Sequence, residues 1–326
     1  MNNLVPSSNS GLMSPGEFQT ALKEALAVPM KSRPYTAHIT RNTPSAFVFL
    51  LDQSGSMNEI ISFRGDSYRK SEAVATIVNE TLREIQNRCQ KTDGIRDYFD
   101  IALIGYGNKD NTAELAWSGA LAGKGFVKPS ELKQFFLSEE EIVTEKMVRG
   151  KSVTDTKMVK TWVQPVASGL TPMNSALLKA ADLLENWIVA HKGKDIFPPI
   201  VINITDGQAT DAKGPELLKT ARRIKDLHTS DGNVLLLNIH LSNIDEEPVL
   251  FPSSQDLLPN DEHAVLLYDM SSEMPKIFNP EIARITHVDT GSTYTGMAYN
   301  ADANMLIQMM QIGTNTSLNR LSPGNA

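Results

Sequence analysis

The strongest constraint on the fold is the alternation of short apolar runs with longer segments whose apolar residues recur at helical spacing. Continuous apolar runs at residues 45–51, 199–205 and 234–241 are typical of strands buried on both faces. Residues 68–90 and 173–191 instead place apolar side chains three and four positions apart, the pattern of amphipathic helices. This alternation predicts a doubly wound α/β fold, with a mostly parallel sheet flanked by helices on both faces.

Weaker signals of the same two kinds complete the expected set of elements. The further strands are expected at residues 98–106, 113–117 (a short edge strand) and 265–268, and the further helices at residues 215–228 and 301–312. Near the N-terminus, Ser14-Pro15-Gly16-Glu17 matches a capping box with proline at the first helical position. This motif predicts a short helix over residues 16–28.

The texture of the sequence divides the chain into three parts. Residues 1–44 are rich in proline, serine and glycine and are expected to form an N-terminal arm that carries the short helix. Residues 45–312 are expected to form the α/β domain, with an insertion at 107–165 between the second strand and residue 171. Residues 313–326 are expected to be a flexible tail.

Composition excludes several classes of protein. The chain has 31 Lys+Arg and 38 Asp+Glu, a net charge of −7, and 6% aromatic residues, which disfavours a nucleic-acid binder. No apolar run approaches the roughly 18 residues of a membrane helix, and no secretory signal is visible. The single cysteine, Cys89, cannot form an intrachain disulfide. We therefore expect a soluble, cytoplasmic protein that acts on neither nucleic acid nor membrane.

Three polar clusters stand at the ends of predicted elements. Asp52, Ser54 and Ser56 form a D-x-S-x-S pattern directly after the first apolar run, Thr171 precedes the helix at 173–191, and Asp206 ends the 199–205 strand. In a doubly wound sheet, ligands bind outside the carboxyl ends of the strands, near the point where the strand order reverses. We expect these five side chains to converge on that rim.

The chemistry of these five residues favours a hard divalent cation. They offer three hydroxyls and two carboxylates with no histidine or cysteine, a donor set that suits Mg²⁺, or Mn²⁺, and disfavours zinc and copper. Three neutral hydroxyl ligands would leave the ion electron-poor, and an open position would attract a carboxylate from outside. The pattern predicts a metal-mediated binding site.

Three phrases also carry a resemblance to a known family. VFLLDQSGSM, GLTPMNSAL and INITDGQATD resemble the metal-ion-dependent adhesion site (MIDAS) of von Willebrand factor type A (VWA) domains. The resemblance covers residues 45–245, and more loosely reaches residue 312. It implies a Rossmann-like domain that holds Mg²⁺ through Asp52, Ser54, Ser56, Thr171 and Asp206 and binds an acidic residue of a partner protein, usually without catalysis.

The end of the sequence adds a finer resemblance. GMAYNADANMLIQMMQIGT is similar to some intracellular bacterial members of the family, which tend to accompany protein kinases and phosphatases. The insertion at 107–165 departs from the compact family pattern. We expect it to form an extra hairpin or small subdomain over the metal rim.

Other interpretations of the same residues remain open. Asp52-Gln53-Ser54-Gly55-Ser56 could be a capping turn without an ion, and Thr171 could be a helix N-cap with Pro172 at the first helical position. Asp206-Gly207 could be a plain strand-ending turn. In function, the alternatives are a Mg²⁺-dependent phosphoryl-transfer enzyme with Asp52 as nucleophile, or a scaffold with a vestigial metal site that uses the arm or the insertion.

Overall fold

The computed structural model describes residues 13–148, 151–242, 247–287 and 291–318. The helices are α1 (Pro15–Leu26), α2 (Lys70–Cys89), α3 (Pro129–Gln134), α4 (Met173–Ala190), α5 (Gly214–Asp226), α6 (Glu262–Met270), α7 (Asn279–Thr286) and α8 (Ala303–Leu318). None of the helices in these parts of the chain combines the length and apolarity needed to cross a lipid bilayer.

Within the described residues, seven strands form the main sheet in the order β14-β15-β13-β10-β1-β6-β7. Their bounds are β1 (Ser45–Gln53), β6 (Phe99–Gly107), β7 (Thr112–Leu115), β10 (Ile200–Thr205), β13 (Leu235–Leu241), β14 (Val249–Leu250) and β15 (Met297–Ala301). The five central strands are parallel, and the edge strands β14 and β7 are antiparallel to their neighbours. The predicted doubly wound, mostly parallel α/β fold is confirmed.

Small two-stranded ribbons accompany the main sheet. They pair β2 (Ile60–Phe63) with β3 (Asp66–Arg69), β4 (Gln90–Lys91) with β5 (Gly94–Ile95), β8 (Ser138–Val148) with β9 (Lys151–Thr161), and β11 (His228–Thr229) with β12 (Gly232–Asn233). Short 3₁₀ turns complete the set at η1 (Gly55–Asn58), η2 (Gly119–Leu121), η3 (Gln255–Leu257) and η4 (Lys276–Phe278).

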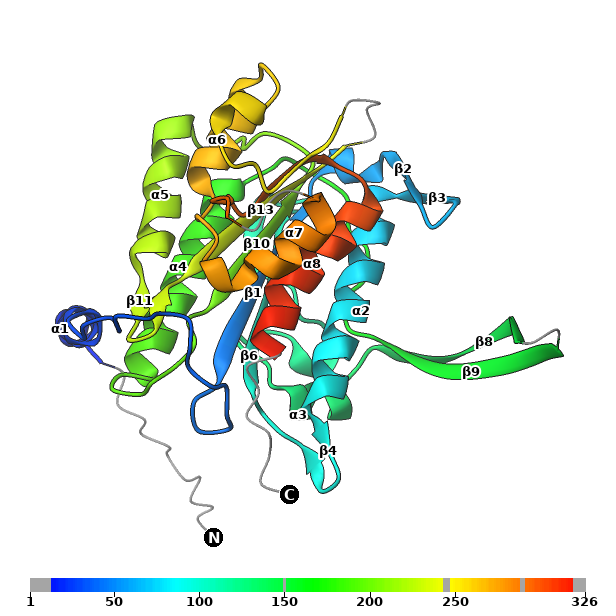
Figure 1. Cartoon of the computed structure of the whole chain (residues 1–326), viewed down its shortest axis with the longest axis horizontal. Coiled ribbons are helices and arrows are strands. Elements are labelled where there is room, and N and C mark those ends of the chain that lie inside the picture. Colours follow the sequence, from blue (N-terminus) through cyan, green and yellow to red (C-terminus); the bar gives the residue numbers. More distant parts are fainter. Residues whose placement is uncertain (1–12, 149–150, 243–246, 288–290, 319–326) are drawn as a thin grey trace, which may run out of the picture.

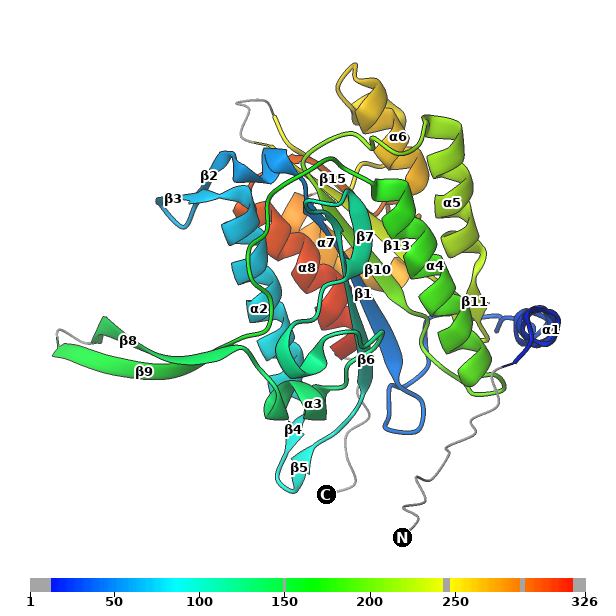
Figure 2. The same ribbon diagram turned by 180° about the vertical axis from the view of Figure 1, so that it is seen from behind.

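The two faces of the sheet support separate apolar cores because side chains alternate along each strand. In β1, Phe47 and Phe49 pack with α2 and α8, whereas Val48 and Leu50 pack with α4 and α5. Figure 1 shows α2, α7 and α8 in front of the sheet, and Figure 2 shows α4 on the opposite face. Burial on both faces explains why these strands are continuous apolar runs rather than alternating ones.

The chain changes direction across the sheet at β1. From β1 it passes through α2 to β6 on one side, and β10, which pairs with the other side of β1, leads through α5 to β13. Helices α2 and α5 lie on opposite faces, so the loops that follow β1 and β10 diverge at their carboxyl ends. This is the topological switch point, where doubly wound sheets leave a crevice for ligands.

The start of the described chain is held against the domain. The predicted capping box is present at α1, because Glu17 N–H donates to Ser14 Oγ at 3.3 Å and Ser14 N–H donates to Glu17 Oε2 at 2.8 Å. Helix α1 packs beside α4. The buried carboxylate of Asp231 then accepts hydrogen bonds from the amides of Thr36 (3.0 Å) and Ala37 (2.9 Å). The described part of the arm is therefore bound to the domain on the face of α4 and β11.

The predicted strand at 265–268 is wrong, because this segment lies inside α6. Asp261 caps that helix by accepting the His263 amide at 2.9 Å, and Ala264 and Leu267, three residues apart, are buried on one helical side. A four-residue apolar run does not distinguish a strand from a turn of buried helix. The N-cap residue Asp261, just upstream, is the sequence signal that favours a helix here.

Strand β15 was not predicted. It lies between β13 and β14, and its pairing with β13 is irregular between Ile239 and Leu241. Asn300 within it has a φ of +53°, so the strand lacks the even alternation by which strands are recognised. Helix α8 then continues to Leu318, beyond the predicted end at 312. Residues 319–326 of the predicted tail lie outside the described residues.

The insertion forms a hairpin, but its position differs from the expectation. Strands β8 and β9 pair over their whole length and extend sideways from the body beside the middle of α2, not over the carboxyl ends of β1 and β10 (Figures 1 and 2). Trp162 anchors the base, because its indole N–H lies 3.0 Å from the carbonyl oxygens of Leu132 and Phe135. Asn79 of α2 accepts the Trp162 amide at 2.8 Å.

Candidate metal centre

The D-x-S-x-S segment forms a tight turn at the end of β1. Asp52 Oδ1 accepts the Ser54 amide at 2.8 Å, and the side chains of both residues are buried. Ser54 Oγ lies 3.0 Å from Ser56 Oγ. The turn therefore places two hydroxyls in contact directly after the buried carboxylate.

The end of β10 brings the second carboxylate to the same place. Leu51 and Ile204 are partners in the parallel register of β1 and β10, so the residues that follow them lie side by side. Thr205 Oγ1 donates to Asp52 Oδ2 at 2.8 Å, and Ser56 Oγ donates to Asp206 Oδ1 at 2.6 Å. Because Ser56 has one proton and gives it to Asp206, Ser54 is the donor between the two serines.

The segment before α4 is held between these two loops. Gln53 O accepts the Ser168 amide at 2.7 Å, and Gly169 O accepts the Gly55 amide at 3.0 Å. On the other side, Thr171 O accepts the Thr210 amide at 2.9 Å. Thr171 is buried at this junction, so all five predicted site residues belong to three loops that are hydrogen-bonded to one another.

Two features explain why the Thr171 segment lies so close. Gly169 has a φ of +80°, and a Cβ at this position would collide with the carbonyl oxygen of Asn108, so glycine is required there. Helix α4 begins at Met173 with Pro172 at the N-cap position, and this N-cap residue makes no side-chain capping hydrogen bond. The alternative in which Thr171 is the N-cap is therefore wrong, and its hydroxyl is not committed to capping.

The donor set fits a hard divalent cation. Mg²⁺ takes oxygen ligands at about 2.1 Å in an octahedron, which puts neighbouring ligand oxygens about 3 Å apart. The 3.0 Å between the Ser54 and Ser56 hydroxyl oxygens matches that spacing. Among the described residues, no group of three or more histidine, cysteine, aspartate or glutamate side chains could hold a metal, so the oxygen-only set with two carboxylates is the candidate.

Burial controls the electrostatics of the first carboxylate. Removal from water, opposed by hydrogen bonds from Ser54 and Thr205, raises the pKa of Asp52 to about 6, and the nearby Asp206 charge adds to the increase. Burial lowers the pKa of His240, which is the strand partner of Thr205, to about 4. His240 is therefore neutral at pH 7 and adds no charge at this rim.

A cation that the sequence patterns did not predict also lies at the site. Lys70, the first residue of α2, is buried, and its Nζ lies 3.1 Å from Asp206 Oδ2 and 2.8 Å from Glu59 Oε2. The available signal was a lysine in the first turn of the predicted helix, an unfavourable position because it lies at the positive end of the helix dipole. Thr205, which holds Asp52, was also missed, because nothing in the sequence indicates that its hydroxyl points to the neighbouring strand.

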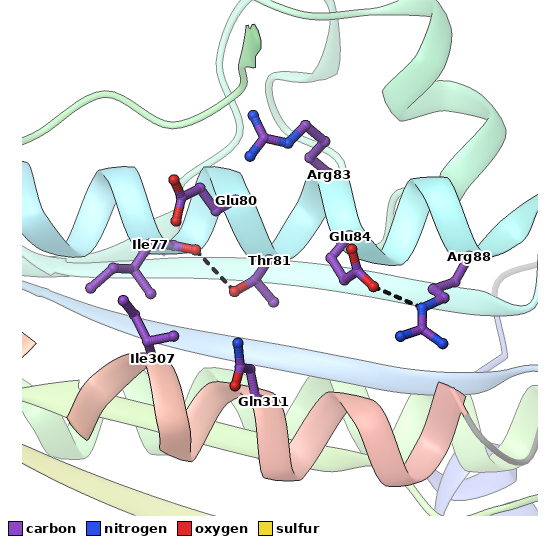
Figure 3. A pocket seen from close by; sticks show the side chains of 8 residues that line it. All are labelled: Ile77, Glu80, Thr81, Arg83, Glu84, Arg88, Ile307 and Gln311. Atoms are coloured by element: carbon purple, nitrogen blue, oxygen red, sulfur yellow. Dashed lines mark hydrogen bonds and ion pairs between the residues drawn. The ribbon is translucent and has the colours of Figure 1, made fainter. Parts of the chain in front are cut away.

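Two of the cavities lined by described residues are distinguished from this centre by their lining residues. One of about 510 Å³ lies between the start of α5 and α6, and its lining begins at Gln208, two residues after Asp206. Another of about 410 Å³ separates α2 from α8 and includes an ion pair between Glu84 and Arg88 at 2.7 Å (Figure 3). Neither is lined by any of the five predicted site residues, so both are distinct from the candidate centre.

The chain matches no family model and no curated protein sequence. Among solved structures it is similar to a von Willebrand factor type A protein from Catenulispora acidiphila, with a TM-score of 0.35 and 11% identity over 65% of this chain and 42% of that one. The chain thus spans less than half of that protein.

Two other structures show weaker similarity. One contains three N-terminal domains of the type V pili tip protein Mfa5 from Porphyromonas gingivalis (TM-score 0.29, 14% identity, 56% of this chain and 25% of that one). The other is an uncharacterized membrane spanning protein from Vibrio fischeri (TM-score 0.24, 13% identity, 60% of this chain and 71% of that one). The assignment of the fold class rests on the strand order and register of this chain.

Proposed function

We propose that this protein is a VWA-type interaction module that binds an acidic group of a partner protein through Mg²⁺ held by Asp52, Ser54, Ser56, Thr171 and Asp206. The observation that carries the proposal is that three loops are hydrogen-bonded to one another through their backbones, and that Ser56 and Asp206, 150 positions apart, share a 2.6 Å hydrogen bond beside Asp52 and Ser54. Mn²⁺ is the substitute ion. The partner class proposed is a kinase or phosphatase signalling protein in the cytoplasm of a bacterium.

The bound ion would supply a positive centre with an open position for an external carboxylate. The protein's own side chains supply the rest. On this proposal, Ser54, Ser56 and Thr171 would offer neutral oxygens, while Asp52 and Asp206 would balance the charge of the ion. Leu170, which precedes Thr171, is 55% exposed, and so offers an apolar contact for a protein partner beside the metal.

The enzymatic alternative finds less support in the geometry. A phosphoryl-accepting aspartate must be reached by its substrate, whereas the side chain of Asp52 is nearly inaccessible. Hydrolysis of a generic phosphomonoester that is lost in Asp52→Asn would favour the enzyme over the interaction module.

The scaffold alternative uses other surfaces, namely the arm or the β8–β9 hairpin. It predicts that Asp52→Ala leaves partner capture unchanged, whereas removal of the arm or hairpin abolishes it. The interaction module predicts the opposite result for each variant.

The first test is thermal unfolding of the wild type and Asp52→Ala in EDTA, Mg²⁺ and Mn²⁺. An ion that binds only the folded protein adds about 2.7 kcal/mol at a hundred times its dissociation constant. We expect a rise in Tm with either ion in the wild type and no rise in Asp52→Ala.

A matched control comes from the same loop. Asp211 is exposed and caps α4 by accepting the Ser175 amide at 2.8 Å. Asp211→Ala should lower Tm through loss of a cap, about 1 kcal/mol, but keep the full response to Mg²⁺. Equal responses of Asp52→Ala and the wild type would refute the proposed site.

A further inference from the structure

Lys70 and Asp206 form an ion pair that is buried within the candidate centre. The lysine side chain is 4% exposed and the aspartate side chain is fully buried, with 3.1 Å between Nζ and Oδ2. Burial of two charges is costly unless they are paired and hydrogen-bonded. Here both oxygens of Asp206 are satisfied, Oδ1 by Ser56 and Oδ2 by Lys70.

The lysine is held from a second direction by Glu59. Their side chains lie 2.8 Å apart, but the Glu59 carboxylate is 53% exposed. Water screens an exposed charge strongly and a buried one weakly. Lys70 therefore acts at the centre mainly as a fixed positive charge, and Glu59 mainly orients it.

The charges at the centre can be summed from these contacts. Ionised Asp52 and Asp206 contribute −2 and Lys70 contributes +1, so the protein offers −1 to a divalent cation. With the ion present the sum is +1. Without Lys70 the same centre would sum to zero.

We propose that Lys70 determines which ligands the centre accepts: it weakens binding of the bare cation and leaves the loaded centre positive, so that an anionic carboxylate is required to complete it. This inference rests on the proposed function and deepens it. Lys70 is a positioning and charge-setting residue, because its Nζ contacts Asp206 and Glu59. Lys70 should therefore weaken binding of the cation and strengthen binding of the carboxylate.

The test measures Mn²⁺ binding by electron paramagnetic resonance of the free ion, with acetate as the carboxylate probe and chloride at equal ionic strength as its control. In the wild type, acetate should tighten Mn²⁺ binding. In Lys70→Met, Mn²⁺ alone should bind about tenfold tighter, because a buried like charge is gone. The effect of acetate should be lost in the same variant.

Two further variants keep the test independent of folding defects. Lys70→Arg retains the charge and should retain the acetate effect. Glu59→Gln changes an exposed, screened side chain and leaves the lysine charge directed at Asp206, so Mn²⁺ affinity should change little and the acetate effect should persist. If Lys70 only supported the fold, Lys70→Met would not bind Mn²⁺ more tightly while losing the acetate effect.

The outcomes separate this inference from the proposed function. Absence of Mn²⁺ binding in the wild type would overturn both. Mn²⁺ binding in the wild type, with unchanged affinity and an unchanged acetate effect in Lys70→Met, would overturn the role of Lys70 alone. Mn²⁺ binding that acetate does not tighten in the wild type would also overturn it.

Discussion

The buried carboxylate of Asp52 makes the stability of the metal-free protein depend on pH in an unusual direction. Its pKa is about 6 in the folded protein and about 3.9 in an unfolded chain. The folded state therefore holds the proton more tightly, and the stability due to this group is present below pH 4 and is lost as pH rises through 6. A difference of about two pKa units corresponds to about 3 kcal/mol.

The assay is urea unfolding in EDTA between pH 4 and pH 7, on the wild type and Asp52→Asn. The amide has no charge to bury and keeps an oxygen for the Ser54 amide. Thr205 Oγ1 can accept from the new NH₂ group, because its own proton has a second acceptor in Gly207 O at 3.0 Å. We expect the variant to gain up to about 3 kcal/mol over the wild type as pH rises from 4 to 7.

Magnesium should reverse this trend in the wild type. The ion favours the ionised carboxylate, so it should stabilise the fold fully at pH 7. Its affinity should fall about tenfold for each pH unit below 6. A difference between the wild type and Asp52→Asn that stays constant with pH in EDTA would refute the reasoning from burial. A pH-dependent difference that Mg²⁺ leaves unchanged would support the effect of burial on Asp52 but refute binding of the ion there.

Two more predictions concern the elements around the centre. Gly169→Ala should destabilise the fold by several kcal/mol and abolish the Mg²⁺ response, because its Cβ would collide with Asn108 O. Gly193→Ala, with a φ of +79° and open space around it, should cost only about 1 kcal/mol. Urea unfolding with and without Mg²⁺ measures both variants, and equal costs would contradict the steric argument. Replacement of residues 139–160 by a two-residue turn should change the free energy of unfolding by no more than about 0.5 kcal/mol and leave the Mg²⁺ response intact. Loss of that response would show that the hairpin supports the centre.

The parts of the fold that sequence could predict are those in which one local pattern decides the outcome. β1 and β10 are buried on both faces and read as continuous apolar runs, and α2 and α4 repeat their apolar residues over several turns. The four residues at 265–268 form an apolar run that is too short to distinguish a strand from a buried helix. β15 is held by pairing with β13, which is far away in sequence, and its own residues do not alternate evenly.

The same distinction applies to the candidate centre. Asp52, Ser54 and Ser56 lie within five residues of one another, so their spacing alone indicates a shared site. Lys70 meets Asp206 across 136 positions, and no pattern in either segment indicates that they pair. Contacts of this kind follow from the sheet order, which places the start of α2 opposite the end of β10.

The topology explains why a charge-setting residue can act from the position of Lys70. At the switch point, the loop after β1 leads into α2 on one face, and the segment before α4 approaches from the other face. A residue at the start of α2 therefore faces the second carboxylate without belonging to any of the three loops that carry the five predicted site residues. A substitution there can change the sum of charges while leaving the oxygen array in place. The hydrogen-bonded loops hold the oxygen array, and the role proposed for Lys70 is to set the charge of that array once it is loaded, and thereby the ligand it accepts.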